Sequence, residues 1–149
     1  MALIVICVLA SFLAILVAAR IKLVRERREL EQYTIEPETL HDLLNANDQV
    51  RVFDVRVPLD LLAYSEIIPG ATRIPPKEIM ENPSLIPKEE DAVIYCTCPD
   101  DKTSREILRR ARGLNFSRLK ILRGGLAGWK AKGYPVEPYE KSFRLDTGM

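Results

Sequence analysis

The chain has almost no net charge, which argues against a role in binding nucleic acid. Its 149 residues include 22 Lys and Arg against 21 Asp and Glu, so the formal net charge is +1. A domain that binds DNA or RNA is usually basic on one face, because it must neutralise phosphates. We therefore expect no nucleic acid among the partners of this protein.

Cysteine and histidine are also scarce. The three cysteines, of which Cys7 lies inside an apolar run, do not make a disulfide framework, and retained thiols fit a reducing compartment. Cys96 and Cys98 supply two thiolates at most, whereas a structural zinc site needs four ligands. His41, the only histidine, is expected to be a plain surface residue on a short helix. The sequence thus predicts neither a metal site nor a cofactor.

Charged side chains are absent from Ala2 to Ala19, ALIVICVLASFLAILVAA. Eighteen helical residues span about 27 Å, just short of the hydrocarbon thickness of a bilayer. The alternative is a cleaved signal peptide, but such a peptide usually carries positive side chains ahead of a shorter apolar core. We predict a retained transmembrane helix over residues 1–19, which makes membrane lipid a partner.

Basic side chains follow this run at once and are missing before it. The positive-inside rule therefore predicts that the soluble domain faces the cytoplasm. A contact with anionic lipid head groups is the alternative role, and a topology signal is the simpler one. Residues 20–32 are rich in Glu and Arg and are expected to continue the helix as a charged stalk. The basic residues are Arg20, Lys22, Arg25, Arg27 and Arg28.

The rest of the chain alternates short apolar runs with helix-like stretches. Residues 33–138 are expected to form one domain, with residues 139–149 as a C-terminal tail. Buried strands are predicted at Val50–Val55, Ala92–Tyr95 and Leu119–Leu122. Helices are predicted at Pro37–Leu44, Lys77–Glu81, Ser104–Gly113 and Gly124–Lys132. This alternation indicates an α/β fold with a largely parallel sheet flanked by helices, in which ligands bind outside the carboxyl ends of the strands.

The most informative segment runs from Tyr95 to Glu106, YCTCPDDKTSRE. An apolar run leads directly into two cysteines, and Thr103 with Glu106 forms the capping-box pattern of a helix start. Backbone N–H groups converge between a strand end and a helix start, and the helix dipole there favours negative charge. At least one of Cys96 and Cys98 is therefore predicted to have a pKa below the ordinary cysteine value of about 8.5.

The competing interpretation of these cysteines is structural. Cysteine often behaves as a small buried hydrophobe, and Cys96 stands at the end of an apolar run. No histidine is close in sequence, so a reactive thiol must be activated by backbone dipoles and Lys102 alone. The residue types by themselves do not name a reaction.

Five motifs follow one another between Tyr33 and Pro138. They are Asp54-Val55-Arg56, Ile68 to Ala71 with Ile74-Pro75, Tyr95-Cys96, Leu122 to Trp129, and Lys132 to Val136. In this order they resemble the DVR strand end, the HIPGA…NIP segment, the strand end that bears the catalytic cysteine, the L-x-GG-x-x-x-W motif and the G-x-PV close of rhodanese-like sulfurtransferases. The cysteine loop is particularly similar to that of rhodanese domains fused to bacterial DedA-type membrane proteins. The resemblance implies a rhodanese-like fold.

The cysteine loop departs from the family pattern C-x-x-G-x-R-S. The glycine and the arginine are missing, and Asp100 and Asp101 are expected to repel an anionic donor such as thiosulfate. Matching the strand end makes Cys96 the nucleophile, with a loop two residues longer than usual. Matching the helix start makes Cys98 the nucleophile, because its separation of six residues from Ser104 is the usual one. We favour Cys96 on the strand register and keep Cys98 as its partner or replacement.

The resemblance implies a membrane-anchored sulfurtransferase that takes sulfur from a small donor or a protein persulfide. A cysteine persulfide would pass this sulfur to a thiol or cyanide acceptor. A non-catalytic interaction module of the same fold, tethered to the membrane, is the alternative that the acidic loop favours. Phosphatase or arsenate reductase chemistry needs a Cys-x5-Arg loop, and the separation from Cys98 to Arg105 is one residue too long. The implied catalytic residues are Cys96 and Cys98, and the implied donor contacts are Thr97, Pro99, Asp100, Asp101, Lys102, Thr103, Ser104, Asp54 and Arg56.

Overall fold

The structure of this chain is a computed structural model that describes residues 2–46, 49–97 and 101–140. The chain divides into two compact units, one ending at Tyr33 and one beginning at Thr34. The first unit is helical, and the second contains the strands of the described chain.

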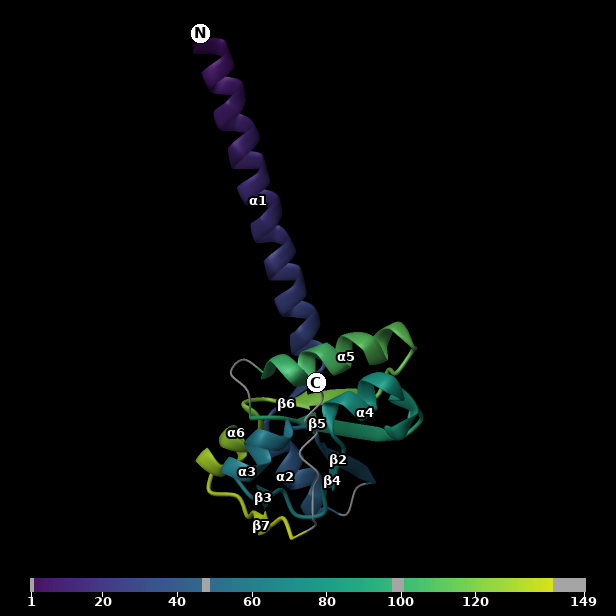
Figure 1. Cartoon of the computed structure of the whole chain (residues 1–149). Coiled ribbons are helices and arrows are strands. Elements are labelled where there is room, and N and C mark those ends of the chain that lie inside the picture. Colours follow the sequence, from purple (N-terminus) through teal and green to yellow (C-terminus); the bar gives the residue numbers. More distant parts are fainter. Residues whose placement is uncertain (1, 47–48, 98–100, 141–149) are drawn as a thin grey trace. The chain divides into compact units, whose positions relative to one another are not determined.

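The first unit consists of helix α1, Ala2–Gln32, which is a single helix of 31 residues (Figure 1). Its large apolar side chains from Ile6 to Val24 are exposed; Ile6, for example, is 63% exposed and Val24 is 48% exposed. The segment Ile6–Gln32 reaches a mean hydropathy of 2.2 in its most apolar window, none of which is buried. By length and composition α1 is therefore a candidate membrane span.

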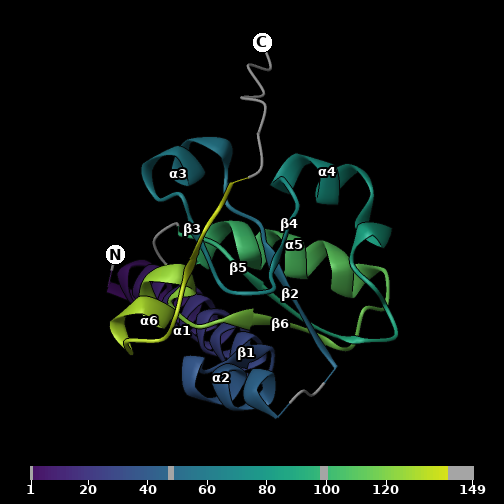
Figure 2. The ribbon, with the colours of Figure 1, turned by 90° about the horizontal axis from the view of Figure 1, so that it is seen from below.

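The second unit is built on a parallel sheet of five strands in the order β1–β6–β5–β2–β4 (Figures 1 and 2). The strands are β1 (Thr34–Ile35), β2 (Val50–Asp54), β4 (Thr72–Arg73), β5 (Asp91–Tyr95) and β6 (Leu119–Leu122). The central strand β5 is buried from Ala92 to Tyr95, as expected of a parallel strand that is covered on both faces. The predicted α/β fold with a largely parallel sheet is confirmed.

Short helices connect these strands. They are α2 (Pro37–Asn45), α3 (Pro58–Ala63), α4 (Pro76–Glu81), the 3-10 turn η1 (Pro83–Leu85), α5 (Lys102–Gly113) and α6 (Gly125–Ala131). Four of them begin on proline, whose restricted φ suits the first helical turn. The sequence predicts α2, α4, α5 and α6 to within two residues of their ends. It misses α3, because a helix of six residues does not show a full amphipathic pattern.

A second sheet pairs β3 (Glu66–Ile67) with β7 (Glu137–Pro138) in antiparallel register. Figure 1 shows this pair on the opposite side of the main sheet from α5, and Figure 2 shows it in front of the sheet. The Tyr139 amide donates a hydrogen bond to the Ser65 carbonyl at 2.7 Å, which continues the connection beyond β7. The end of the domain is thus attached to the segment that follows α3.

An aromatic cluster closes the core next to α2 and α6. Trp129 is 1% exposed, and its Nε1 donates a hydrogen bond to the Pro135 carbonyl at 2.8 Å. The His41 ring stacks on Tyr134, with centroids 4.1 Å apart and planes 9° apart. Because its side chain is only 28% exposed, the prediction that His41 is a plain surface residue is wrong. Its ring is packed into the aromatic cluster.

Candidate active site

Cys96 lies at the carboxyl end of the central strand. Strand β5 ends at Tyr95, whose carbonyl accepts a hydrogen bond from the Val55 amide at 3.0 Å. The carbonyl of Cys96 accepts one from the Leu126 amide at 3.1 Å, in the first turn of α6. Cys96 is itself buried, at 1% exposure. The main chain of the cysteine is thereby held against the start of a helix.

Two glycines after β6 allow α6 to approach this cysteine closely. Gly124 and Gly125 have positive φ values of 69° and 53°, a conformation that side chains disfavour. A Cβ on Gly125 would lie 1.8 Å from the carbonyl oxygen of Cys96. That distance is far inside atomic contact, so only glycine leaves room for the main chain of Cys96.

Helix α5 begins at Lys102, with Asp101 as its N-cap residue. Asp101 has a φ of 53°, and its Oδ2 accepts a hydrogen bond from the Gly124 amide at 3.2 Å. The capping box predicted from Thr103 and Glu106 is therefore wrong, because the helix starts two residues earlier. Aspartate tolerates the left-handed conformation, and here a contact with a distant glycine accompanies the turn into the helix.

Other contacts hold the two ends of the cysteine loop. Thr97 Oγ1 donates a hydrogen bond to Asp60 Oδ2 at 2.7 Å, and Asp60 lies in the first turn of α3. Sequence reasoning missed Asp60 because it missed α3. At the other end of the loop Ser104 is buried, and its hydroxyl has no hydrogen-bond partner within the described ranges. The candidate residues that lie outside those ranges are Cys98, Pro99 and Asp100.

The domain thus combines a cysteine at a strand end, a close approach of α6 at Gly125, and a helix that begins after the cysteine loop. Residues 36–132 match the rhodanese-like domain family. The chain belongs to this family.

The relatives of this rhodanese-like domain include proteins named as sulfurtransferases. It is 30% identical to a sulfurtransferase of Allochromatium vinosum, over 68% of this chain and 92% of that protein. It is 31% identical to the probable adenylyltransferase/sulfurtransferase MoeZ of Mycobacterium tuberculosis, over 68% of this chain but only 26% of that larger protein. These relatives support a sulfurtransferase-like activity.

Solved structures share the fold of this rhodanese-like domain. A full-length protein from Lactobacillus plantarum matches with a TM-score of 0.64 and 25% identity, over 81% of this chain and 98% of that one. The thiosulfate sulfurtransferase of Pseudomonas aeruginosa matches with a TM-score of 0.58 and 27% identity, over 72% of this chain and 19% of that one.

The DVR residues of this rhodanese-like domain form a buried ion pair. Asp54 and Arg56 are both 0% exposed, and Arg56 Nη2 lies 2.5 Å from Asp54 Oδ2. Arg56 also donates hydrogen bonds to the carbonyls of Tyr64 and Glu66, each at 2.7 Å. The resemblance implies donor contacts for this pair; in the structure its charged groups bond to each other and to these carbonyls, and both side chains are buried.

Tyr95 connects the ion pair to the central strand. Its hydroxyl donates a hydrogen bond to Asp54 Oδ2 and accepts one from the Ile68 amide, each at 3.2 Å. Burial, followed by the negative charge of Asp54, raises the pKa of Tyr95 well above its ordinary value. The hydroxyl therefore stays protonated at physiological pH, and Tyr95 is a positioning residue immediately before Cys96.

Proposed function

We propose that this chain is a membrane-anchored sulfurtransferase that carries sulfane sulfur as a persulfide of Cys96. The observation that supports this most directly is the position of Cys96 at the carboxyl end of the central strand, against the start of α6. In parallel α/β sheets this edge is where ligands bind. The sulfurtransferases among the relatives share the domain that presents this cysteine.

The proposed reaction consists of two displacements at sulfur. The Cys96 thiolate attacks the sulfane sulfur of the donor and forms a sulfur–sulfur bond, while the donor's bond to that sulfur breaks. With thiosulfate as donor, sulfite leaves with the electron pair. A thiolate or cyanide acceptor then attacks the outer sulfur of the persulfide, and the Cys96 thiolate leaves with the pair. The cycle needs no outside oxidant or reductant.

The start of α5 is proposed to stabilise the anionic sulfur. This helix has twelve residues, and the positive end of its dipole lies where the cysteine loop ends. Main-chain N–H groups from Thr97 to Ser104 are proposed as the cradle for the persulfide, as in other nests of successive amides. The exposed Lys102 adds a positive charge at the same end. Both effects favour the thiolate over the thiol.

Cys98 is proposed as a resolving partner. Its thiolate would attack the inner sulfur of the Cys96 persulfide, form a disulfide between the two residues and release hydrosulfide with the electron pair. A ring with one residue between its cysteines is strained and easily reduced, so an ordinary cellular thiol can reset it. In the alternative register Cys98 carries the persulfide. Cys98→Ser would then lose the sulfur adduct, and Cys96→Ser would keep it.

Mass spectrometry of the intact protein after exposure to thiosulfate tests this proposal. The wild type and the matched control Cys7→Ser are expected to gain one sulfur atom, about 32 Da, and to pass it to cyanide. Cys96→Ser is expected to lose the adduct and to lower kcat/KM by about 10³-fold or more, because the nucleophile is gone. Cys98→Ser is expected to keep the adduct.

The other outcomes of this measurement separate the rival proposals. Loss of the adduct in Cys98→Ser alone would assign the persulfide to Cys98. If neither the wild type nor Cys98→Ser, which lacks the resolving thiol, ever gains sulfur, a non-catalytic interaction module is favoured. That module is the second candidate function, which the burial of Cys96 also suits.

The acidic loop is expected to disfavour anionic donors. Asp100→Asn combined with Asp101→Asn should raise kcat/KM for thiosulfate about tenfold, mainly through KM, since each short-range like-charge contact costs on the order of 1 kcal/mol. An asparagine oxygen still accepts the hydrogen bond from Gly124, so the turn is kept. The gain should shrink as salt is added. Glu78→Gln with Glu81→Gln on α4 is the charge-matched control, and equal kinetics for both double variants at low salt would contradict this explanation.

The membrane topology is a separate part of the proposal. Helix α1 is expected to remain in the mature protein and to hold the domain on the cytoplasmic side, because basic residues follow its apolar part. Intact cells treated with a membrane-impermeant thiol reagent should show no labelling of Cys96 or Cys98, and lysed cells should show it. Strong labelling without lysis would reverse the orientation.

A further inference from the structure

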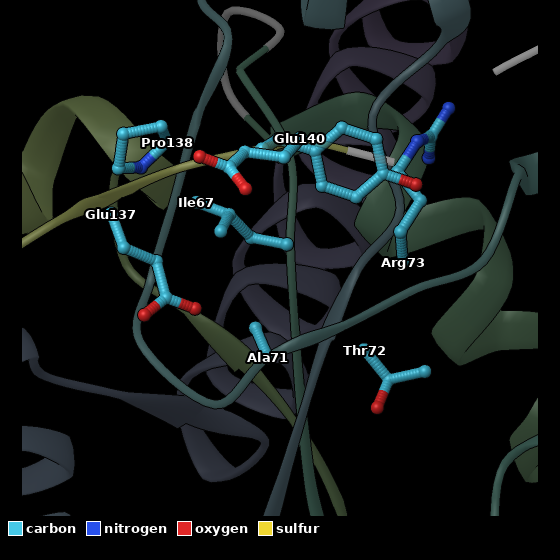
Figure 3. A pocket seen from close by; sticks show the side chains of 8 residues that line it. Ile67, Ala71, Thr72, Arg73, Glu137, Pro138 and Glu140 are labelled. Carbon is cyan, nitrogen blue, oxygen red and sulfur yellow. The ribbon is translucent and has the colours of Figure 1, made fainter. Parts of the chain in front are cut away.

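A pocket of about 540 Å³ opens between the edge of the main sheet and the β3–β7 pair (Figure 3). Strand β4 is the last strand of that sheet, and its Arg73 pairs in register with Asp54 of β2. The pocket therefore lies beside the end of β2, where the Asp54 carboxylate accepts a hydrogen bond from the Tyr95 hydroxyl. Its lining includes Ile67, Ala71, Arg73, Glu137, Tyr139 and Glu140.

Arg73 brings an incompletely satisfied cation to this pocket. Its Nη1 donates to the main-chain oxygen of Asp54 at 3.4 Å, close to the limit for a hydrogen bond. Its Nε is buried and has no hydrogen-bond partner in the part of the chain that the structure describes. Burial is also the main cause that lowers the pKa of Arg73, which indicates a charge with incomplete compensation. A ligand carboxylate in the pocket would compensate the charge of the guanidinium.

Two carboxylates face the guanidinium across the pocket. In Figure 3 the carboxylates of Glu137 and Glu140 lie on one side and the guanidinium of Arg73 on the other, and the side chain of Ile67 lies between Glu137 and Arg73. Both glutamates are exposed. This distribution is complementary to a molecule with a positive end, an apolar middle and a negative end.

We propose that this pocket binds a small zwitterion of the amino-acid or short-peptide class. Its carboxylate pairs with Arg73, and its ammonium group lies between Glu137 and Glu140. The volume falls in the range of about 300–1,000 Å³ that small-molecule sites occupy. The two glutamates disfavour phosphate or sulfate, and Arg73 disfavours a simple amine, because like charges repel at short range.

Ligand-observed NMR on the full chain in lipid nanodiscs tests this site. The probes are γ-aminobutyrate and glycylglycine, with butyrate and butylamine as analogues that keep only one of the two charges. At least one zwitterion is expected to bind, and both single-charge probes should bind at least about tenfold more weakly, because each loses one charge-assisted contact. The tighter of the two zwitterions identifies the source as an amino acid or a peptide.

Three variants locate the binding. Arg73→Gln is expected to weaken zwitterion binding about tenfold or more, and Glu137→Gln with Glu140→Gln should weaken it without weakening butyrate. Arg109→Gln, which removes an exposed charge on α5, is the matched control and should bind like the wild type. If Arg73→Gln does not fold, the exposed glutamate pair still carries the test. Equal binding of zwitterions and single-charge probes, or unchanged binding in the pocket variants, would overturn the proposal.

Discussion

Replacing Arg56 with methionine is expected to destabilise the domain by about 3–5 kcal/mol. The variant leaves the carboxylate of Asp54 buried at 0% exposure without its counter-charge. It also leaves the carbonyls of Tyr64 and Glu66 without the donors that they now have. Removing one partner of a buried pair costs more than the pair contributes, because the remaining charge has lost both water and its partner.

Urea unfolding followed by the fluorescence of Trp129, the only tryptophan, measures this loss. The matched control is Arg51→Met, which breaks an ion pair with Glu90 whose side chains are 63% and 49% exposed. That control should cost at most about 1 kcal/mol, since water screens exposed pairs.

A double variant tests the cause of the loss. Asp54→Leu combined with Arg56→Met removes both charges and should recover much of the stability, because no uncompensated charge stays buried. If Arg56→Met unfolds at the same urea concentration as the control, the pair does not support the domain in the way described.

Gly125→Ala is expected to destabilise the domain by about 2–4 kcal/mol and to displace Cys96. The new Cβ would lie 1.8 Å from the carbonyl oxygen of Cys96, and that neighbour is main chain, which cannot rotate away. The positive φ of 53° adds the strain of a side chain in the left-handed region. Because the clash is with the candidate nucleophile, we expect the persulfide yield to fall together with the stability.

Gly70→Ala is the control for the backbone term alone. Gly70 has a φ of 76°, but a Cβ there would meet nothing within 4 Å. This variant should cost about 1 kcal/mol and leave sulfur transfer unchanged. If Gly70→Ala and Gly125→Ala behave alike in unfolding and in persulfide formation, close packing against Cys96 is not the reason why residue 125 is a glycine.

Local sequence patterns were sufficient wherever the cause of the structure is local. The apolar run Ala92–Tyr95 predicts the central strand and therefore the position of Cys96 at its end. Pro37 and Pro76 mark the starts of two helices, because proline is preorganised for the first turn. An uncharged run of eighteen residues likewise predicts a long apolar helix.

Local patterns were insufficient where distant segments compete with them. Thr103 and Glu106 form a good capping box, yet the helix starts at Lys102, with Asp101 as its N-cap and a hydrogen bond from Gly124 to that residue. The loop contact from Thr97 to Asp60 has no local signal, since it joins residues on two different connections. Two-residue strands such as β3 and β7 likewise exist only through their pairing with each other.

The sequence alone thus determined the fold class, the central strand with its terminal cysteine and the apolar helix, because hydrophobic periodicity and proline act within a few residues. Only the tertiary structure decided what surrounds those elements. It turned Asp54 and Arg56 into a buried pair, brought Gly125 against Cys96, and placed Arg73 across a pocket from Glu137. The first of these depends on burial by the rest of the domain and the other two on contacts between segments far apart in the chain, and no window of neighbouring residues contains that information.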